Sequence, residues 1–231
     1  MQFRFLGTGG AFDYAYGNSA AWINFRGKHI LLDCGNSVYA RLREKDLTEH
    51  IDYILITHCH DDHVGSLSTV ILHHFFMLKS PRKAVILTPD PEFQAILASL
   101  LSFSIPDPEK YVTFLPLSEI EGLSAINTTG KHVWGMPSYG YVFEDEDETV
   151  VYSGDIGDSE FIFDHIAPNP DKPVRVFHES SFEPSDGVHT YYRKLIPKRE
   201  RYDLYLYHVD PRTNPEDNPI PLVANIPDLL V

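Results

Sequence analysis

Residues 58–63 read His-Cys-His-Asp-Asp-His and follow the apolar run Ile-Asp-Tyr-Ile-Leu-Ile-Thr at residues 51–57. The run predicts a buried strand, and the near-helical spacing of apolar residues over 62–78 predicts a helix after it. In a strand, His58 and His60 project to the same side, so both can face one ion. Asp62 and His63, where the chain turns into the helix, can reach a second ion.

Zinc prefers imidazole and carboxylate ligands, so this junction predicts a metal site. The alternative is a set of surface histidines with Asp62 as a helix cap. Three imidazoles and two carboxylates within six residues, directly after a buried strand, favour the metal site.

Composition limits the classes of protein and of partner. The chain has 231 residues, 43% of them hydrophobic and 23% charged, which is typical of a soluble globular protein. Its 33 acidic and 19 basic side chains give a net charge of -14, which disfavours a long nucleic acid as partner. No apolar stretch reaches the length of a membrane span, and Cys34 and Cys59 are the only cysteines, so we expect a cytoplasmic protein with no membrane partner.

The pattern of elements predicts an α/β fold. Helices are expected over 37–45, 62–78 and 93–101, with a short one near 190–195. We expect one compact domain over 1–210, followed by an extended tail over 211–231, because five prolines interrupt that last segment. The expected strands are 2–6, 19–25, 29–33, 51–57, 83–88, 111–115, 124–128, 138–143, 149–153, 174–178 and 202–208.

At this point the motifs resemble a known family. The pattern His58-x-His60-x-Asp62-His63, with Gly-Thr-Gly-Gly-Ala at 7–11 and Leu-Asp-Cys-Gly at 32–35, resembles the metallo-β-lactamase superfamily over nearly the whole chain. It is most similar to the ribonuclease Z-like phosphodiesterase branch. The resemblance implies a four-layer αββα sandwich with two metal ions at one edge of the two sheets.

The resemblance also implies a full set of ligands. His132 precedes the strand 138–143, Asp155 ends a Ser-Gly-Asp segment, and His208 ends the last strand, as the corresponding ligands do in the family. Two zinc ions are implied, with manganese as the alternative metal. One would be held by His58, His60 and His132 and the other by Asp62, His63 and His208, with Asp155 as the bridge.

For two aspartates the sequence leaves a second structural role open. Asp155 could be a turn residue after Gly154. Asp33 either orients a ligating histidine or serves the turn before Gly35.

Two further segments point to phosphodiester chemistry by resemblance. Residues 177–182 are similar to the His-Glu-Ala-Thr-Phe segment of ribonuclease Z, and residues 187–190 to its His-Ser-Thr segment. Glu179 would then orient His189, and His189 would protonate the leaving oxygen or bind the phosphate. With Asp62, these two complete the expected catalytic set. Alternatively, His189 is a solvated histidine at the start of a helix.

The size of the expected substrate is inferred from the absence of a long inserted arm. Transfer RNA processing members of the branch carry a long arm that grips the substrate, commonly inserted between the positions of His132 and Asp155. Only 22 residues, 133–154, separate these positions here, which is room for one hairpin. A compact phosphodiester is therefore expected. Relatives without the arm include cyclic nucleotide phosphodiesterases, among them the anti-Pycsar enzymes that open cyclic pyrimidine nucleotides, and phosphoribosyl cyclic phosphate hydrolases.

We thus expect a phosphodiesterase that hydrolyses a small substrate, a cyclic nucleotide, by metal-bound hydroxide, and a homodimer by resemblance alone. The alternatives are a ribonuclease Z-type tRNA 3′ endonuclease, another hydrolase of this fold acting on a phosphoribosyl cyclic phosphate, thioester or lactam, and a non-catalytic metal or nucleotide sensor. Tyr14, Tyr16, Phe75 and Phe76 lie near the motifs and could stack on a base, although core packing explains most such rings better.

Overall fold

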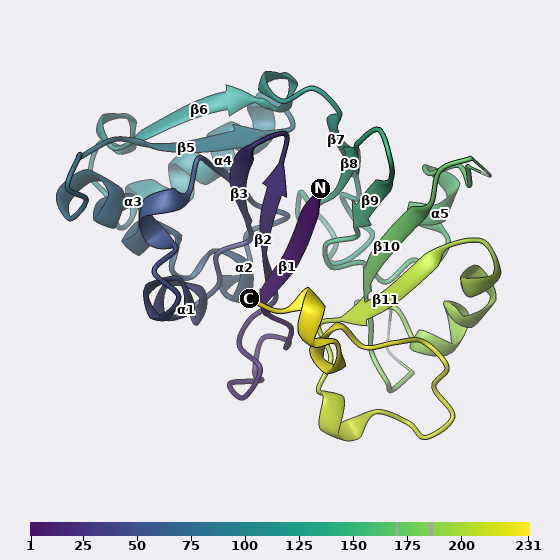
Figure 1. The fold of residues 1–231 in the computed structure, drawn as a ribbon. Helices are drawn as coiled ribbons and strands as arrows, with labels where there is room; N and C mark the ends of the chain where they lie inside the picture. Colours follow the sequence, from purple (N-terminus) through teal and green to yellow (C-terminus); the bar gives the residue numbers. More distant parts are fainter. Residues whose placement is uncertain (170, 185–186) are drawn as a thin grey trace.

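The protein is described by a computed structural model that covers residues 1–169, 171–184 and 187–231. Two sheets face each other (Figure 1). The 6-stranded sheet contains, in spatial order, β1 (Gln2–Gly7), β2 (Ala20–Phe25), β3 (Lys28–Leu32), β4 (Tyr53–Leu55), β5 (Ala84–Thr88) and β6 (Val112–Pro116). The 5-stranded sheet contains β11 (Asp203–Tyr207), β10 (Val174–Glu179), β9 (Thr149–Tyr152), β8 (Tyr139–Glu144) and β7 (Leu123–Asn127). All the strands expected from the sequence are present.

Each sheet combines antiparallel and parallel pairs. β1, β2 and β3 are antiparallel neighbours, and β3 to β6 run parallel. In the other sheet β7, β8 and β9 are antiparallel, and β9, β10 and β11 run parallel. Residues 133–154 contain the β8–β9 hairpin, as the sequence predicts. The parallel strands matter for function, because their carboxyl ends lie at one edge.

Helices cover the outer faces of the sheets and complete the αββα sandwich (Figure 1). They are α1 (Val38–Glu44), α2 (Asp61–Val64), α3 (Leu67–Phe76), α4 (Pro91–Ser102) and α5 (Phe161–Asp164). Short 3-10 turns lie at Thr48–His50, Pro108–Lys110, Leu117–Glu119, Tyr192–Lys194, Ile196–Glu200, Pro211–Thr213, Val223–Asn225 and Pro227–Leu229. The helix expected near 190–195 is thus a 3-10 turn.

The prediction of a single helix over 62–78 is wrong, because the helix is interrupted at residues 65 and 66, between α2 and α3. A Cβ on Gly65 would lie 1.9 Å from Oδ1 of Asn36, and the Ser66 hydroxyl donates to the Gly35 carbonyl at 2.6 Å. The loop after β3 therefore packs closely against residues 65 and 66, where α2 ends and α3 begins.

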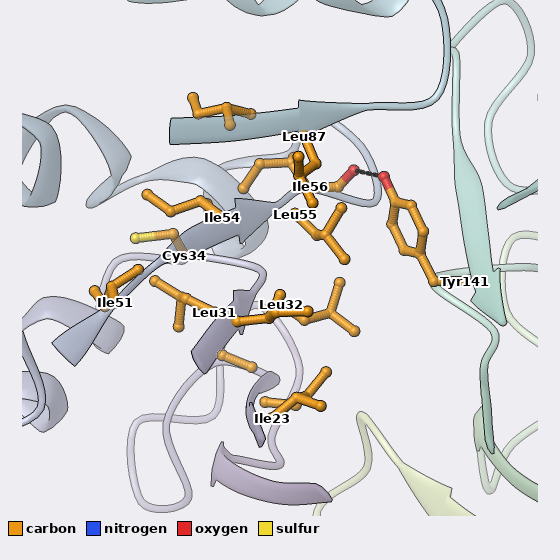
Figure 2. Close-up of a cluster of buried hydrophobic side chains, with 14 of the residues drawn as sticks. Ile23, Leu31, Leu32, Cys34, Ile51, Ile54, Leu55, Ile56, Leu87 and Tyr141 are labelled. Carbon is orange, nitrogen blue, oxygen red and sulfur yellow. Dashed lines mark hydrogen bonds between the residues drawn. The ribbon is translucent and has the colours of Figure 1, made fainter. Parts of the chain in front are cut away.

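The core between the sheets is rich in aromatic rings. Phe3 stacks on Phe177 with ring centroids 4.8 Å apart, and Tyr152 stacks on Tyr207 at 4.5 Å. Figure 2 shows the adjoining aliphatic cluster and one hydrogen bond that joins the two sheets: the Tyr141 hydroxyl donates to the Ile56 carbonyl at 2.7 Å. Ile56 lies two residues before His58, so the second sheet helps to fix the strand that leads into the histidine motif.

Residues 211–231 do not form one extended stretch. Pro211 and Pro227 each begin a 3-10 turn, a position where the missing N–H of proline costs nothing. Leu222 and Val223 are buried, Leu206 pairs with Leu222 in an isolated bridge, and the Val231 amide donates to the Phe5 carbonyl at 3.1 Å. The segment therefore packs on the domain from which it extends.

Candidate metal centre

The carboxyl ends of the parallel strands gather the polar side chains of the site. β3 and β4 end just before Asp33 and the histidine motif, and β9, β10 and β11 lead to Asp155, Glu179 and His208. His132 joins them from the loop after β7. The sandwich thus delivers residues that are up to 175 positions apart, from 33 to 208, to one edge.

Seven of these side chains form two clusters that match the expected ligand sets. Within each cluster the ligand atoms lie within 4.8 Å of one another: His58, His60 and His132 in the first, and Asp62, His63, Asp155 and His208 in the second. Asp155 lies between the clusters. Its Oδ2 is 3.9 Å from Nε2 of both His58 and His132 and 3.5 Å from Nε2 of both His63 and His208.

The donor atoms fit metal ions. Nε2 of His63 and Oδ1 of Asp155 are buried and have no hydrogen-bond partner in the part of the chain that the structure describes. Nδ1 of His60 lies 3.0 Å from Nε2 of His58 and 3.2 Å from Nε2 of His132. One ring N–H can point directly at only one of the other two nitrogens, whereas a cation would satisfy all three lone pairs.

Partners behind the rings set their orientation. Nδ1 of His63 lies 2.8 Å from Oδ2 of Asp33, and Nδ1 of His132 lies 2.7 Å from the Val188 carbonyl oxygen. If these nitrogens carry the protons and donate, the tautomer places both Nε2 lone pairs toward the centre. Asp33 also accepts from the Thr57 amide at 2.8 Å, and the Thr57 hydroxyl lies 3.0 Å from Nδ1 of His58.

Thr57 and the Val188 carbonyl were not expected from the sequence. A threonine at the end of a strand is ordinary by β-propensity, and a carbonyl has no residue-type signal.

The backbone is unusual at the same place. Asp33 and His208 have φ of 63°, in the left-handed region that costs energy for residues other than glycine. At Gly35 an added Cβ would lie 1.9 Å from the Asp62 carbonyl oxygen. This close approach explains why glycine follows Asp33 and Cys34. Asp33 itself lies both in the turn and in contact with His63.

The electrostatics of the centre suit a cation. Burial lowers the pKa of His58, and the neighbouring His63 lowers it further, which favours the neutral ring that a metal ligand needs. Burial also opposes protonation of His63, but Asp155 and Asp33 hold its pKa well above the usual value. These carboxylates would equally favour a bound cation. Burial raises the pKa of Cys59 to about 11, so this thiol in the motif stays protonated.

Glu179 and His189 form a pair beside the clusters. Nδ1 of His189 lies 3.0 Å from Oε2 of the fully buried Glu179, whose Oε1 accepts from the amides of Ile156 at 3.2 Å and Thr190 at 2.9 Å. Burial lowers the pKa of His189, but Glu179, with Asp155 and Asp62, raises it to about 9. A nitrogen of His189 also lies within 4.8 Å of ligand atoms of His132 and Asp155.

Two adjoining cavities open on this centre. One, of about 650 Å³, is lined by Phe12, Tyr14, His60, Asp62, His132, Asp155, His189 and His208 among others. The other, of about 540 Å³, shares Phe12, His189 and His208 and extends toward Ser180 and Arg212. A further cavity of about 800 Å³ lies between the β7–β8 strands and residues 165–169, and its lining includes none of the two ligand clusters.

The candidate stacking rings separate into two groups. Tyr14 lies at the cavity, whereas Phe75 and Phe76 pack with Tyr111 at the end of α3, with Phe75 and Tyr111 centroids 4.7 Å apart. Tyr16 lies beside Arg212. Tyr14 is therefore the one of these four that lines the metal cavity.

Comparison with known proteins places the chain in a family. The family model described as anti-Pycsar protein Apyc1 matches residues 1–220. The chain belongs to this family. An Apyc1 family relative, the anti-Pycsar protein Apyc1 of Bacillus phage BSP38, is 31% identical over 231 aligned residues, which cover 90% of this chain and 88% of the relative.

Solved structures confirm the fold of this Apyc1 family member. The metallo-β-lactamase fold protein YhfI from Bacillus subtilis matches with a TM-score of 0.67 and 19% identity, over 94% of this chain and 89% of that one. Human tRNase Z, short form, matches with a TM-score of 0.66 and 20% identity, over 94% of this chain and 97% of that one. The predicted metallo-β-lactamase superfamily and its similarity to anti-Pycsar proteins are therefore confirmed.

Two broader conclusions follow for the chain. The family, the fold and the two clusters together support a metal-dependent hydrolase. Across the described residues, no helix combines the length and the apolar character that crossing a bilayer requires.

Proposed function

We propose that this protein is a dinuclear metal-dependent phosphodiesterase that opens a cyclic nucleotide. The observation that carries the proposal is His189, which lines the same cavity as residues of both ligand clusters and is held from behind by the buried Glu179. A metal site alone would suit several hydrolytic reactions. A buried carboxylate that holds a histidine beside the metal site adds a proton donor for an oxygen leaving group.

The proposed ligands are those expected from the sequence. His58, His60 and His132 would hold one zinc, Asp62, His63 and His208 the second, and Asp155 would bridge them, with manganese as the alternative metal. The near-equal distances of Asp155 Oδ2 from four histidine nitrogens, 3.5 to 3.9 Å, support the bridge. When bound, such cations lower the pKa of water to about 7 and stabilise negative charge on phosphoryl oxygens.

The protein's own residues would handle the leaving group. Hydrolysis forms a bond from phosphorus to the water oxygen and breaks the bond to the 3′ oxygen, which then needs a proton. Glu179 engages Nδ1 of His189, so Nε2 would be the nitrogen that donates. Although burial lowers it, the contact with Glu179 raises the pKa of His189, which favours the protonated ring that a general acid requires.

The compact loop structure supports a small substrate. Between His132 and Asp155 the chain forms the β8–β9 hairpin, which leaves no long arm for gripping transfer RNA. The net charge of -14 also disfavours a long polyanion. Relatives that carry the anti-Pycsar name support the choice of a cyclic nucleotide.

The test is a substrate panel with the zinc-loaded or manganese-loaded protein. It contains cyclic mononucleotides, cyclic dinucleotides, bis(p-nitrophenyl) phosphate and a precursor transfer RNA. We expect turnover of at least one cyclic nucleotide to a linear phosphomonoester, and loss of that turnover in Asp155→Asn. Rapid cleavage of the precursor RNA without turnover of cyclic nucleotides would instead favour a tRNA 3′ endonuclease, and hydrolysis of neither would favour a sensor. The homodimer implied by resemblance stays a prediction, and light scattering of the full chain tests it.

A further inference from the structure

Two aromatic side chains project at the mouth of the metal cavity with almost no packing partner. Phe12 is 92% exposed and Tyr14 is 89% exposed. Both line the 650 Å³ cavity, and Phe12 lines the adjoining one as well. Single exposed apolar residues are common, but two large rings within three residues over a candidate active site are a feature to explain.

The segment that carries them, residues 10–16, is a closed loop and not a loose strand end. At its neck the Thr8 amide donates to the Tyr16 carbonyl at 3.2 Å, and the Gly9 amide donates to the Gly17 carbonyl at 2.8 Å. The Ala15 amide donates to Oδ1 of Asp13 at 3.1 Å inside the loop. The two rings are therefore presented by a preformed backbone.

Arg212 ties this loop to the chain that follows the last ligand. Its guanidinium forms a two-point ion pair with Asp210, with contacts of 2.7 and 2.8 Å, and lies 3.7 Å from Oδ1 of Asp13. Its Cζ lies 5.8 Å from the centre of the Tyr16 ring. The buried Oδ2 of Asp13 has no hydrogen-bond partner among the described residues, so Arg212 has a second acceptor close by. Arg212 thus contacts the loop at Asp13, between the two rings, and at Tyr16.

The walls of the cavity differ in chemistry. The inner wall carries the histidines and aspartates that suit a metal-bound phosphate, and the outer rim carries the two rings. Its described lining residues include no lysine or arginine, so the rim suits an uncharged planar group better than a second phosphate. Aromatic side chains stack on bases with little dependence on base identity, because every base has a π face.

We propose that Phe12 and Tyr14 form the nucleobase-binding platform of the site, and that Arg212 is a positioning residue that holds the platform over it. The inference rests on the proposed phosphodiesterase function and deepens it by assigning the part of the protein that recognises the base. A substrate that carries a cyclic phosphate and a planar base would use both walls, whereas the same phosphate without a base would use only the inner one.

The test compares two substrates that differ only in the base. One is a 3′,5′-cyclic mononucleotide, and the other is the 3′,5′-cyclic phosphate of methyl riboside. We expect the Phe12→Ala/Tyr14→Ala variant to lose about tenfold in kcat/KM for the nucleotide, mainly through KM, with a much smaller loss for the methyl riboside. Tyr14→Phe should keep most of the nucleotide activity. Phe103→Ala removes a ring that is 88% exposed elsewhere, and it should leave both rates at the wild-type level.

Arg212→Ala should raise KM for the nucleotide more than it lowers kcat, since the platform would be displaced and the reacting centre retained. Equal losses of Phe12→Ala/Tyr14→Ala on both substrates, or no loss on the nucleotide, would overturn the inference. Wild-type turnover of the methyl riboside ester alone would also overturn it while leaving the phosphodiesterase in place. Turnover of neither substrate by the wild type would refute the proposed function itself.

Discussion

Oδ2 of Asp33 lies 2.8 Å from Nδ1 of His63, and both side chains are fully buried. The aspartate follows β3 and the histidine lies in α2, so the contact joins the first sheet to the motif of the metal centre. Asp33 also accepts from the amide and hydroxyl of Thr57, which in turn lies beside His58. One carboxylate therefore fixes, directly or through Thr57, a histidine of each cluster.

Asp33→Asn should weaken zinc binding by about 10- to 100-fold without unfolding the chain, because partners behind the ligands typically contribute that much. Asparagine tolerates the left-handed backbone of Asp33, so the turn should survive. Calorimetric zinc titration measures the effect. Asp46→Asn is the matched control, since Asp46 is exposed and also has a positive φ of 55°. Equal zinc affinity in Asp33→Asn and wild type would show that Asp33 serves the turn alone.

Tyr141→Phe should lower the free energy of unfolding by about 1–3 kcal/mol, because it leaves the buried carbonyl of Ile56 without its 2.7 Å hydrogen bond. The lost hydrogen bond is at Ile56, two residues before His58, so zinc affinity should fall as well. Urea unfolding measures the first effect and zinc titration the second. Tyr53→Phe alters a half-buried tyrosine of β4 and serves as the control. A fully stable Tyr141→Phe with weaker zinc binding would contradict this explanation.

His189→Ala should reduce turnover of a cyclic nucleotide by roughly 100- to 10,000-fold, the usual contribution of a general acid. The loss should be much smaller for bis(p-nitrophenyl) phosphate, whose leaving group departs without a proton. Glu179→Gln should show the same pattern more weakly, since it changes the partner that holds His189. Steady-state rates on both esters decide the matter. Equal losses on the two would mean that His189 binds phosphate and donates no proton.

The buried His74 side chain should make the folded protein less stable in acid. Burial lowers its pKa from 6.5 to about 4, and its Nε2 lies 2.9 Å from the Thr48 carbonyl oxygen. Between these values the unfolded chain binds a proton that the folded chain does not. Stability present above pH 6.5 should therefore fall as the pH drops toward 4, by about 3 kcal/mol at most from this residue.

Urea unfolding at pH 7 and at pH 4.5 tests this expectation in wild type, His74→Gln and the exposed-site control His50→Gln. The glutamine at position 74 should reduce the difference between the two pH values, whereas the one at position 50 should not. An unchanged pH difference in His74→Gln would contradict the account.

Much of the site could be predicted because its ligands carry residue-type signals. The hexapeptide 58–63 predicts a metal site from chemistry alone, and the resemblance supplies His132, Asp155 and His208 across long stretches of chain. The structure brings all of them together. Glu179 and His189 are paired for the same reason, since both belong to segments similar to those of ribonuclease Z.

What the sequence could not supply depends on close approaches between distant segments. Position 65, between α2 and α3, packs so closely on Asn36 that an added Cβ would lie 1.9 Å from its Oδ1. Thr57 and the Val188 carbonyl matter only because the fold places them against His58 and His132. Phe12 carries no signal in the sequence, and Tyr14 is one of four candidate stacking rings until the fold leaves both exposed over the cavity.

The central claim is a site in which Asp155 bridges two metal ions. Native mass spectrometry of the zinc-loaded chain, alongside Asp155→Asn prepared in the same way, tests it most directly. We predict two zinc ions per chain in the wild type and fewer in the variant, with the folded charge-state distribution retained in both. One zinc ion per wild-type chain, or two in Asp155→Asn with unchanged affinity, would contradict the account.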